Sequence, residues 1–237
     1  MQQSLEPLKI QSLKEACAAR LEGLILSGEL KIGERLPSER DFAARLGVSR
    51  PVLHEALVDL DAKGLVEIVP RRGVFVSDYR TKGSLTLLTA LLAYSDGELS
   101  EPFLRSLLDM RLLMETETAR LAALQRTPEH LQTLHALLAQ EAVIDRRDAE
   151  QLSELDFTFH QTVAQASGNL MYLLVINSLR PMYTNITRRF FMKYPGNGVL
   201  EQVFQFHQKL TAAIEAVDSQ AAAQVMADML RHGAEHL

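Results

Sequence analysis

Histidine and aspartate side chains in the second half of the chain have the chemistry of a metal site. Asp156 and His160 are four residues apart, so a helix would present both on one face. His207 and His232 each fall on an apolar stripe of a later predicted helix, which turns them toward a core. One carboxylate and three imidazoles suit a borderline divalent ion such as zinc, nickel or manganese. These four residues are therefore candidate metal ligands, with open positions for water or a carboxylate effector.

The same four residues also have a plainer interpretation. A histidine on an apolar helix stripe is most often a packed core residue with hydrogen-bonded ring nitrogens. An aspartate four residues before a histidine is a common and weak pattern. A buried metal could also activate water, but no general base or nucleophile accompanies these ligands, so an enzyme is the less favoured function. Spacing alone leaves both the metal site and the packed core open.

A second group of chemically active side chains is the set of arginines within residues 33–76. Arg40 and Arg50 lie on two short predicted helices, and Arg71 and Arg72 occupy the tip of a predicted hairpin. Guanidinium groups in such places suit the phosphate oxygens and base edges of DNA. The alternative is a solvated basic face on a helical domain.

The helices that carry these arginines are marked by residues that start and stop helices. Gly47 ends the first helix, Ser49 caps the second, and Pro51 is tolerated in the second helix's first turn. The second helix, predicted over about 50–63, turns an apolar stripe inward and leaves His54 facing outward. Two helices joined by a tight glycine turn are typical of a helix-turn-helix, in which the second helix enters the major groove.

Two short strands are predicted after these helices, over 65–69 and 73–76. Arg71, Arg72 and Gly73 lie at the tip between them. A two-arginine hairpin tip beside a recognition helix suits phosphate contact or insertion into the minor groove. The position of this wing favours DNA binding over a solvated basic face.

Length and composition set the outer bounds. The 237 residues suffice for two modest domains, and 47% hydrophobic residues support real cores. No apolar run is long enough to span a membrane, the N-terminus lacks a signal-peptide pattern, and the single cysteine cannot form an intrachain disulfide, so we expect a cytoplasmic protein. The net charge of −5 means that basic groups are concentrated locally rather than spread over the DNA-binding domain.

The expected fold is mainly α, with a winged helix-turn-helix before an all-helical bundle. We assign residues 1–78 to the winged domain and the polar, glycine-broken segment 79–84 to a linker. Residues 85–237 are the all-helical domain. About seven amphipathic helices are predicted from residue 84 onward, among them 84–94 and a long one over 169–193 with an irregularity near Pro181. A bundle of this size can enclose a ligand pocket.

The N-terminal third resembles the DNA-binding domain of GntR-family transcription regulators. The motifs that carry the resemblance are Gly33-x-x-Leu36-Pro37-Ser38-Glu39-Arg40, Gly47-Val48-Ser49-Arg50, Glu55-Ala56-Leu57 and Arg72-Gly73-x-Phe75-Val76. The resemblance implies that Arg40 and Arg50 contact DNA. At His54 the family usually has another arginine, and a histidine lacks the bidentate fork with which arginine reads a base. The expected DNA-binding residues are Arg40, Ser49, Arg50, Pro51, His54, Arg71, Arg72 and Gly73.

The rest of the chain is similar to the helical ligand-binding domain of the FadR subfamily of these regulators. The matching segments are Asp109-Met110-Arg111 with Glu115, Leu155-Asp156 with Phe159-His160, Ala166-Ser167-Gly168-Asn169, Met182-Tyr183-Thr184, and Phe206-His207. Many members hold a metal with an Asp-x-x-x-His pair and two later histidines, and this metal helps to bind small carboxylates. The resemblance implies those roles for Asp156, His160 and His207. His232 fits less cleanly, because the segment before it is about three residues longer than usual.

Three further residues are candidate effector contacts. Arg111 lies on an otherwise apolar stripe, and its guanidinium suits a carboxylate, although an internal ion pair with Glu115 is equally compatible with the spacing. Tyr183 is a weaker candidate. Asn169 is another, with a helix N-cap as its alternative.

A neighbouring branch of the subfamily responds to long-chain acyl-CoA and lacks the metal histidines. Segments 166–172 and 181–189 resemble that branch, but the histidines favour a metal-assisted small carboxylate. We therefore expect a homodimeric regulator whose two winged domains read a near-palindromic operator in double-stranded DNA. Release from DNA on binding the acid is the usual direction in the family.

Overall fold

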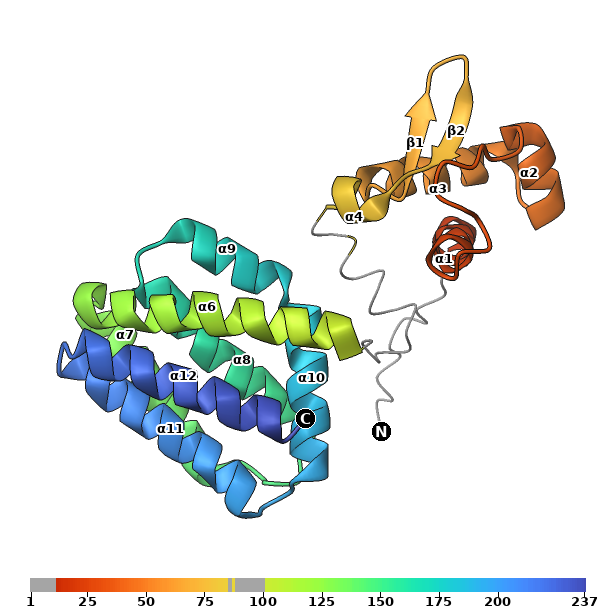
Figure 1. Ribbon diagram of the computed structural model, residues 1–237. Helices are drawn as coiled ribbons and strands as arrows, with labels where there is room; N and C mark the ends of the chain where they lie inside the picture. Colours follow the sequence, from red (N-terminus) through yellow and green to blue (C-terminus); the bar gives the residue numbers. More distant parts are fainter. Residues whose placement is uncertain (1–11, 85–86, 88–100) are drawn as a thin grey trace, which may run out of the picture. The chain divides into compact units, whose positions relative to one another are not determined.

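The computed structural model describes residues 12–84, Leu87 and 101–237 of the chain, which divides into two compact units, Met1–Glu98 and Leu99–Leu237 (Figure 1). Most of the helix predicted over 84–94 lies outside the described residues. Each unit has its own hydrophobic core.

The first unit is the predicted winged helix-turn-helix. Its elements are α1 (Leu13–Leu26), α2 (Glu39–Leu46), α3 (Arg50–Ala62), β1 (Val66–Val69), β2 (Gly73–Val76) and α4 (Tyr79–Lys82). Local sequence signals determine the boundaries. Gly47 ends α2 with a φ of 69°, in the left-handed region that glycine adopts without strain, and the Ser49 hydroxyl accepts a hydrogen bond from the Val52 amide at the start of α3.

One hydrophobic core holds this unit together. Leu21 of α1, Leu53 and Leu60 of α3 and Leu65 before β1 are all fully buried, and α1 packs against α3 behind the helix-turn-helix. The antiparallel strands pair Val66 with Val76, which extends this core into the wing. Helix α1 is therefore the third helix of the small domain, and the core fixes α3 relative to the wing.

The segment 79–84, which the sequence assigns to a linker, is packed on the winged domain along its length. Residues Tyr79–Lys82 form α4, and the Ser84 amide donates a hydrogen bond to the Lys63 carbonyl over 3.2 Å. Gly64 permits this contact, because a Cβ at that position would lie 2.1 Å from the Lys82 carbonyl oxygen. The boundary between the two compact units falls later, between residues 98 and 99.

The second unit is entirely helical in the residues that the structure describes. Its helices are α6 (Glu101–Gln125), α7 (Pro128–Val143), α8 (Ala149–Ala166), α9 (Leu170–Ser178), α10 (Arg180–Lys193), α11 (Gly198–Glu215) and α12 (Ser219–Glu235). The helix predicted over 169–193 is in fact two helices, with a break at Leu179. Pro181 explains the break, because proline lacks an amide hydrogen and its ring fits only the first turn of the next helix.

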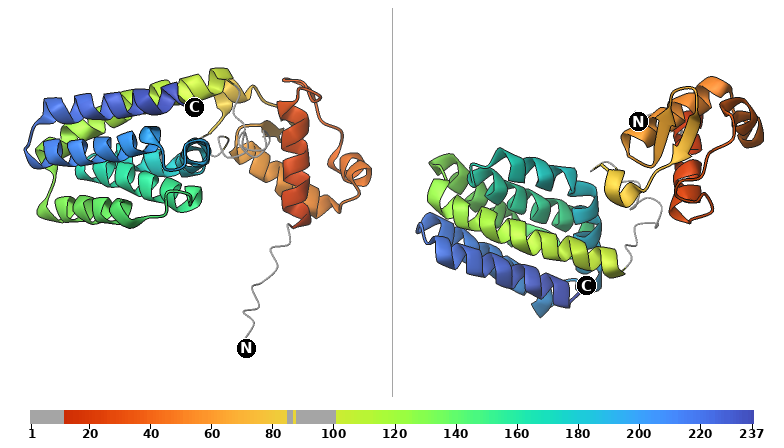
Figure 2. Two further views of the ribbon diagram at one scale, coloured as in Figure 1. Left: turned by 90° about the horizontal axis from the view of Figure 1, so that it is seen from below. Right: turned by 45° about the horizontal axis from the view of Figure 1, so that its top comes forward.

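Helix α8 runs through the middle of the bundle. It packs against α6, α7, α9 and α10, while α12 lies along α6 and α11, and these three run side by side in each view of Figures 1 and 2. Fully buried Phe159, Val163 and Leu210 connect α8 to α11. The candidate metal ligands therefore lie on helices that face each other. No helix in the described part of the chain is long and apolar enough to cross a membrane.

Candidate functional site

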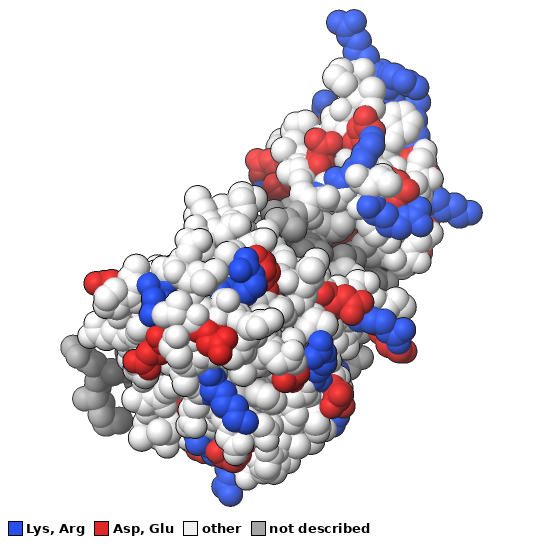
Figure 3. Space-filling model, turned by 60° about the vertical axis from the view of Figure 1, so that its left-hand side comes forward, with Lys and Arg blue, Asp and Glu red and all other residues white. Residues whose placement is uncertain are grey.

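The first unit has a hollow surface between α2, the start of α3 and the wing. Arg40, Arg50, Arg71 and Gly73 all line it, so residues from three predicted motifs lie on one surface. Arg72 is exposed at the wing tip, and Ser49, Pro51 and His54 are exposed at the beginning of α3. Figure 3 shows Lys and Arg side chains at several places on the surface of this unit, with Asp and Glu among them. This arrangement suits an elongated polyanion.

The wing tip is held in a constrained backbone conformation. Arg71 has a φ of 63°, which is uncommon for a residue other than glycine, and Gly73 has a φ of 111°. A Cβ on Gly73 would lie 3.1 Å from the Arg35 Nε atom. The backbone at the tip thus presents Arg71 and Arg72 outward, and Gly73 leaves room for Arg35 beneath them.

Glu39 is an acidic residue in this otherwise basic surface, and sequence reasoning did not assign it a role. Its carboxylate accepts a hydrogen bond from Arg50 Nε over 3.3 Å and contacts His54 Nδ1 over 3.1 Å. Although partial burial raises its pKa, the bonds from His54 and Arg50 lower the pKa of Glu39 overall. Glu39 therefore connects two residues of α3. Its position inside the Leu-Pro-Ser-Glu-Arg motif was the available signal.

Replacing Glu39 with glutamine is expected to reduce discrimination between operator and random DNA by about tenfold. The neutral amide no longer fixes Arg50 and His54, and a well-placed base contact supplies roughly 1–3 kcal/mol of discrimination. Fluorescence anisotropy with operator and random duplexes, across a salt series, measures this ratio. Glu55→Gln, an exposed change on the same helix, is the matched control. Equal ratios in the two variants would contradict a positioning role for Glu39.

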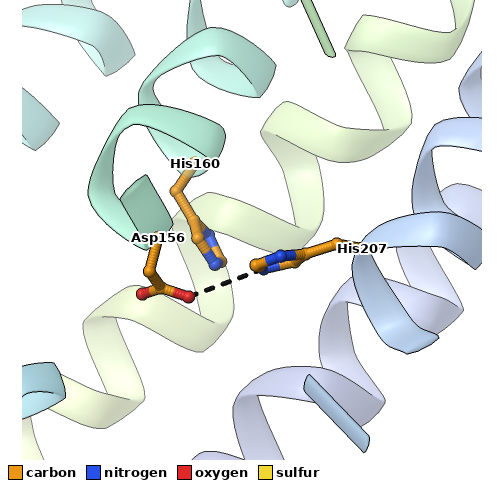
Figure 4. A group of neighbouring side chains, drawn as sticks. All are labelled: Asp156, His160 and His207. Carbon is orange, nitrogen blue, oxygen red and sulfur yellow. Dashed lines mark ion pairs between the residues drawn. The ribbon is translucent and has the colours of Figure 1, made fainter. Parts of the chain in front are cut away.

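In the second unit, three of the four predicted ligands converge. Asp156 and His160 on α8 and His207 on α11 point toward one another (Figure 4), and one ligand atom from each lies within 4.8 Å of the others. All three residues are buried, and His207 Nε2 lies 3.5 Å from Asp156 Oδ1. His207 Nε2 is buried without a hydrogen-bond partner. A buried nitrogen of this kind is rare unless a ligand or ion completes it.

Two buried glutamates orient the imidazoles. His160 Nδ1 hydrogen-bonds to Glu115 of α6, and His207 Nδ1 hydrogen-bonds to Glu141 of α7. Because a carboxylate only accepts hydrogen bonds, each Nδ1 carries a proton, and the neutral ring keeps its lone pair on Nε2. This carboxylate–histidine pairing is typical of metal-binding histidines. Sequence reasoning missed Glu141, whose signal was a carboxylate on the apolar stripe of Leu134 and Leu137.

Arg111 and Tyr183 form the polar wall beside the cluster. Arg111 Nε donates to Glu115 Oε1 over 2.7 Å, and its guanidinium carbon lies 3.9 Å from the centre of the Tyr183 ring. The Tyr183 hydroxyl donates to Asp156 Oδ2 over 3.1 Å. The internal ion pair considered for Arg111 is therefore present, and Arg111 also lines a pocket that adjoins the cluster. Tyr183 holds a candidate ligand in place.

The buried charges at the cluster do not balance. Glu115, Glu141 and Asp156 face one guanidinium, Arg111, which leaves an excess of two negative charges when both imidazoles are neutral. Burial raises the pKa of Glu115, but Arg111 and His160 lower it to about 2, so this carboxylate is ionised. Burial lowers the pKa of His207, yet Glu141 and Asp156 raise it above its ordinary value. The cluster thus favours either protons or a divalent cation at its centre.

A pocket opens from the cluster toward α10 and α12. Its cavity volume is about 50 Å³, and Arg111, Asp156 and His160 are its polar end. Apart from Thr187, the rest of its wall is apolar, contributed by Leu108, Ile186, Phe190, Phe191, Val203, Met229, Leu230, Gly233, Ala234 and Leu237. A small molecule with an anionic end and a less polar body fits this distribution.

The structure does not bring two of the predicted residues to the cluster. His232 hydrogen-bonds through Nε2 to the Val199 carbonyl over 3.1 Å, and Met229 lines the pocket instead. His232 lies three residues further along α12, about 4.5 Å along the helix axis, and on a different side. Asn169 accepts hydrogen bonds from the Met171 and Tyr172 amides, so it caps α9, the alternative that the sequence left open.

Both units of the chain match known protein families. Residues 13–76 match the family model described as bacterial regulatory proteins, gntR family, and residues 106–232 match the FCD domain. The chain is 36% identical over 180 residues to the transcriptional regulator Mce2R of Mycobacterium tuberculosis, covering 76% of this chain and 74% of that protein. It is 29% identical over 221 residues to the putative L-lactate dehydrogenase operon regulatory protein of Escherichia coli, covering 90% and 82%.

Among solved structures, the fold is similar to that of the Lar protein of Listeria monocytogenes. The TM-score is 0.58 with 17% identity, over 96% of this chain and 99% of that chain. The two relatives in sequence are transcription regulators, so the expected function class is confirmed and the chain is not an enzyme. A gntR-type DNA-binding domain followed by an FCD domain makes this chain a member of the GntR family of transcription regulators, FadR subfamily.

Proposed function

We propose that this regulator is a homodimer that leaves its operator when a small carboxylate binds beside a divalent metal in the helical unit. The observation that carries the proposal is the convergence of Asp156, His160 and His207 at the polar end of a pocket that Arg111 also lines. Two winged units would read the two halves of a near-palindromic site. The cytoplasm, where operator DNA is found, is the proposed place of action.

The residues present fit a divalent ion. Three observations favour a cation among the three side chains. His207 Nε2 has no hydrogen-bond partner, both imidazoles bond through Nδ1 to a carboxylate, and the buried charges leave a negative excess. One carboxylate and two imidazoles suit zinc, nickel or manganese. Such an ion would supply a Lewis-acidic centre for a carboxylate oxygen, and Arg111 and Tyr183 would orient the rest of the acid.

A small acid is favoured over long-chain acyl-CoA by the site itself. The pocket has a cavity volume of about 50 Å³, which suits a compact ligand better than an acyl chain with its CoA carrier. The Escherichia coli relative is named after the L-lactate dehydrogenase operon, and lactate is a small carboxylate. The proposed effector class is therefore a short-chain carboxylate that contacts the ion and Arg111.

The acid would act by favouring one of two arrangements of the helices around it. Pocket residues come from α6, α8, α10, α11 and α12, so a ligand that binds one arrangement better shifts the population toward it. The coupling between acid and DNA is reciprocal, so operator DNA should weaken binding of the acid by the same factor.

The test is a titration of operator DNA with metal-loaded protein, followed by candidate acids and acyl-CoA. Specific binding that a small acid relieves, and that a chelator makes insensitive to the acid, supports the proposal. Relief by acyl-CoA alone, unaffected by chelator, would favour the metal-free alternative. Sedimentation equilibrium at the same concentrations tests the dimer, and a monomer on a single half-site would contradict it.

Replacing Arg111 with lysine is expected to weaken effector binding about tenfold or more while metal content stays unchanged. Lysine keeps the buried positive charge that Glu115 requires but loses the planar fork that binds a carboxylate with two parallel hydrogen bonds. Isothermal titration of the active acid measures the change. Arg105→Lys, an exposed change on the same helix, is the control. Unaltered affinity for the acid would return Arg111 to a purely structural role.

A further inference from the structure

The side of α12 that faces the cluster presents a thioether. Met229 is 4% exposed and lines the same pocket as Asp156 and His160. The other α12 residues in the pocket wall are Leu230, Gly233, Ala234 and Leu237, which with Met229 form one helical stripe. Along this stripe no described residue has a nitrogen or oxygen side chain, so α12 adds no hard or borderline ligand to the cluster.

His232 is occupied elsewhere and could not replace Met229 without turning the helix. Its Nε2 atom bonds to the Val199 carbonyl, and its ring packs 4.5 Å from the His236 ring and 5.8 Å from the Phe206 ring, measured between centroids. Meanwhile Ala222, Met226 and Met229 are buried in the core of the bundle. Rotating α12 to turn His232 inward would expose these residues.

We propose that Met229, and not His232, is the α12 residue facing the metal, so that the ion has three protein ligands and an open position toward the pocket. This inference rests on the metal in the proposed function. A thioether is a soft, neutral donor and a poor ligand for zinc, nickel or manganese. Asp156, His160 and His207 are then the whole protein ligand set, and the open position is where a carboxylate oxygen of the effector binds.

The packing around the cluster determines the direction of this open position. Glu115 and Glu141 hydrogen-bond to the Nδ1 atoms of the two imidazoles, on the side away from Nε2. The Tyr183 hydroxyl hydrogen-bonds to Oδ2 of Asp156. Protein side chains therefore occupy those sides. The side bordered by Met229 and Arg111 leads into the pocket. An acid entering there meets the ion and the guanidinium together, so metal and acid should strengthen each other's binding.

The test measures nickel affinity by equilibrium dialysis for the wild-type chain and three variants. Met229→His should raise affinity about tenfold or more, because it adds an imidazole at the open side. Met229→Leu, which keeps volume and removes the sulfur, should leave affinity unchanged, as should His232→Ala. Loss of nickel in His232→Ala, or in Met229→Leu, would overturn the inference. These two variants keep it testable even if Met229→His fails to fold.

Cobalt gives a second readout that does not depend on DNA. The visible absorption of the cobalt-loaded wild type should change when acetate is added, because acetate takes the open position. The change should be smaller in Met229→His. A cobalt-loaded wild type that is indifferent to acetate would overturn the inference.

The outcomes separate this inference from the proposed function. If the wild type binds nickel and His232→Ala loses it, the metal stands and the three-ligand site fails. If only Met229→His binds nickel, Met229 faces the cluster but the three wild-type ligands do not hold the ion, so the three-ligand site and the metal dependence both fail. If no variant binds nickel or cobalt, both fail.

Discussion

Replacing Arg50 with alanine is expected to abolish specific operator binding while the fold stays intact. Arg50 is the first residue of α3, its side chain is 73% exposed, and it lines the basic surface between α2 and the wing. A bidentate arginine–base contact supplies roughly 1–3 kcal/mol, and a dimer loses it in both half-sites. The sum corresponds to a loss of roughly thirtyfold to more than a thousandfold in affinity for the operator.

The measurement first requires an operator sequence. This sequence is obtained by selecting, from random DNA duplexes, those that the wild-type chain binds. Anisotropy titrations then compare Arg50→Ala with Arg20→Ala, an exposed arginine on α1 away from the basic surface. Thermal unfolding should agree between both variants and the wild type, because the Arg50 side chain is 73% exposed. Operator affinity retained in Arg50→Ala would mean that α3 is not the recognition helix.

The winged unit was predictable because residues close together in the sequence determine where its helices and strands begin and end. Gly47 and Ser49 mark adjacent helix ends within three residues, and the structure uses both as the sequence indicates. The wing has two short strands and a glycine at its tip, which need only neighbouring residues to pair. What sequence could not give was the contact between Glu39 and His54, 15 residues apart, because it depends on how α2 and α3 cross.

In the helical unit, the contacts between helices could not be predicted from the sequence. The pair Asp156 and His160 follows from helix periodicity, but the meeting of α8 with α11 at His207 is a tertiary contact. Glu141 became part of the site only because α7 packs beside α8 and α11. Residues 225, 229 and 232 form a plausible inward stripe, yet core packing of Ala222 and Met226 gives α12 a different rotation. An amphipathic pattern identifies the apolar face of a helix. It does not identify which residue of that face lies beside a given ligand.

Metal content is expected to be about one equivalent in the wild type and only a trace in His160→Ala. His160 is 3% exposed and is one of the three proposed ligands, so its removal would leave only Asp156 and His207. Since changes to residues that merely orient a ligand cost 10–100-fold in metal affinity, loss of a ligand itself should cost more. Mass spectrometry on protein purified without chelator or affinity metal measures the content.

The matched control for that measurement is His135→Ala. His135 lies on α7 with a side chain 52% exposed, so it removes an imidazole without touching the cluster. Metal retained in His135→Ala and lost in His160→Ala would locate the ion, and operator release by the acid should disappear with it. Absence of metal from wild type and variants alike, even after incubation with zinc or nickel, would contradict the prediction. The imidazoles would then be core residues paired with Glu115 and Glu141, and acyl-CoA would become the leading effector.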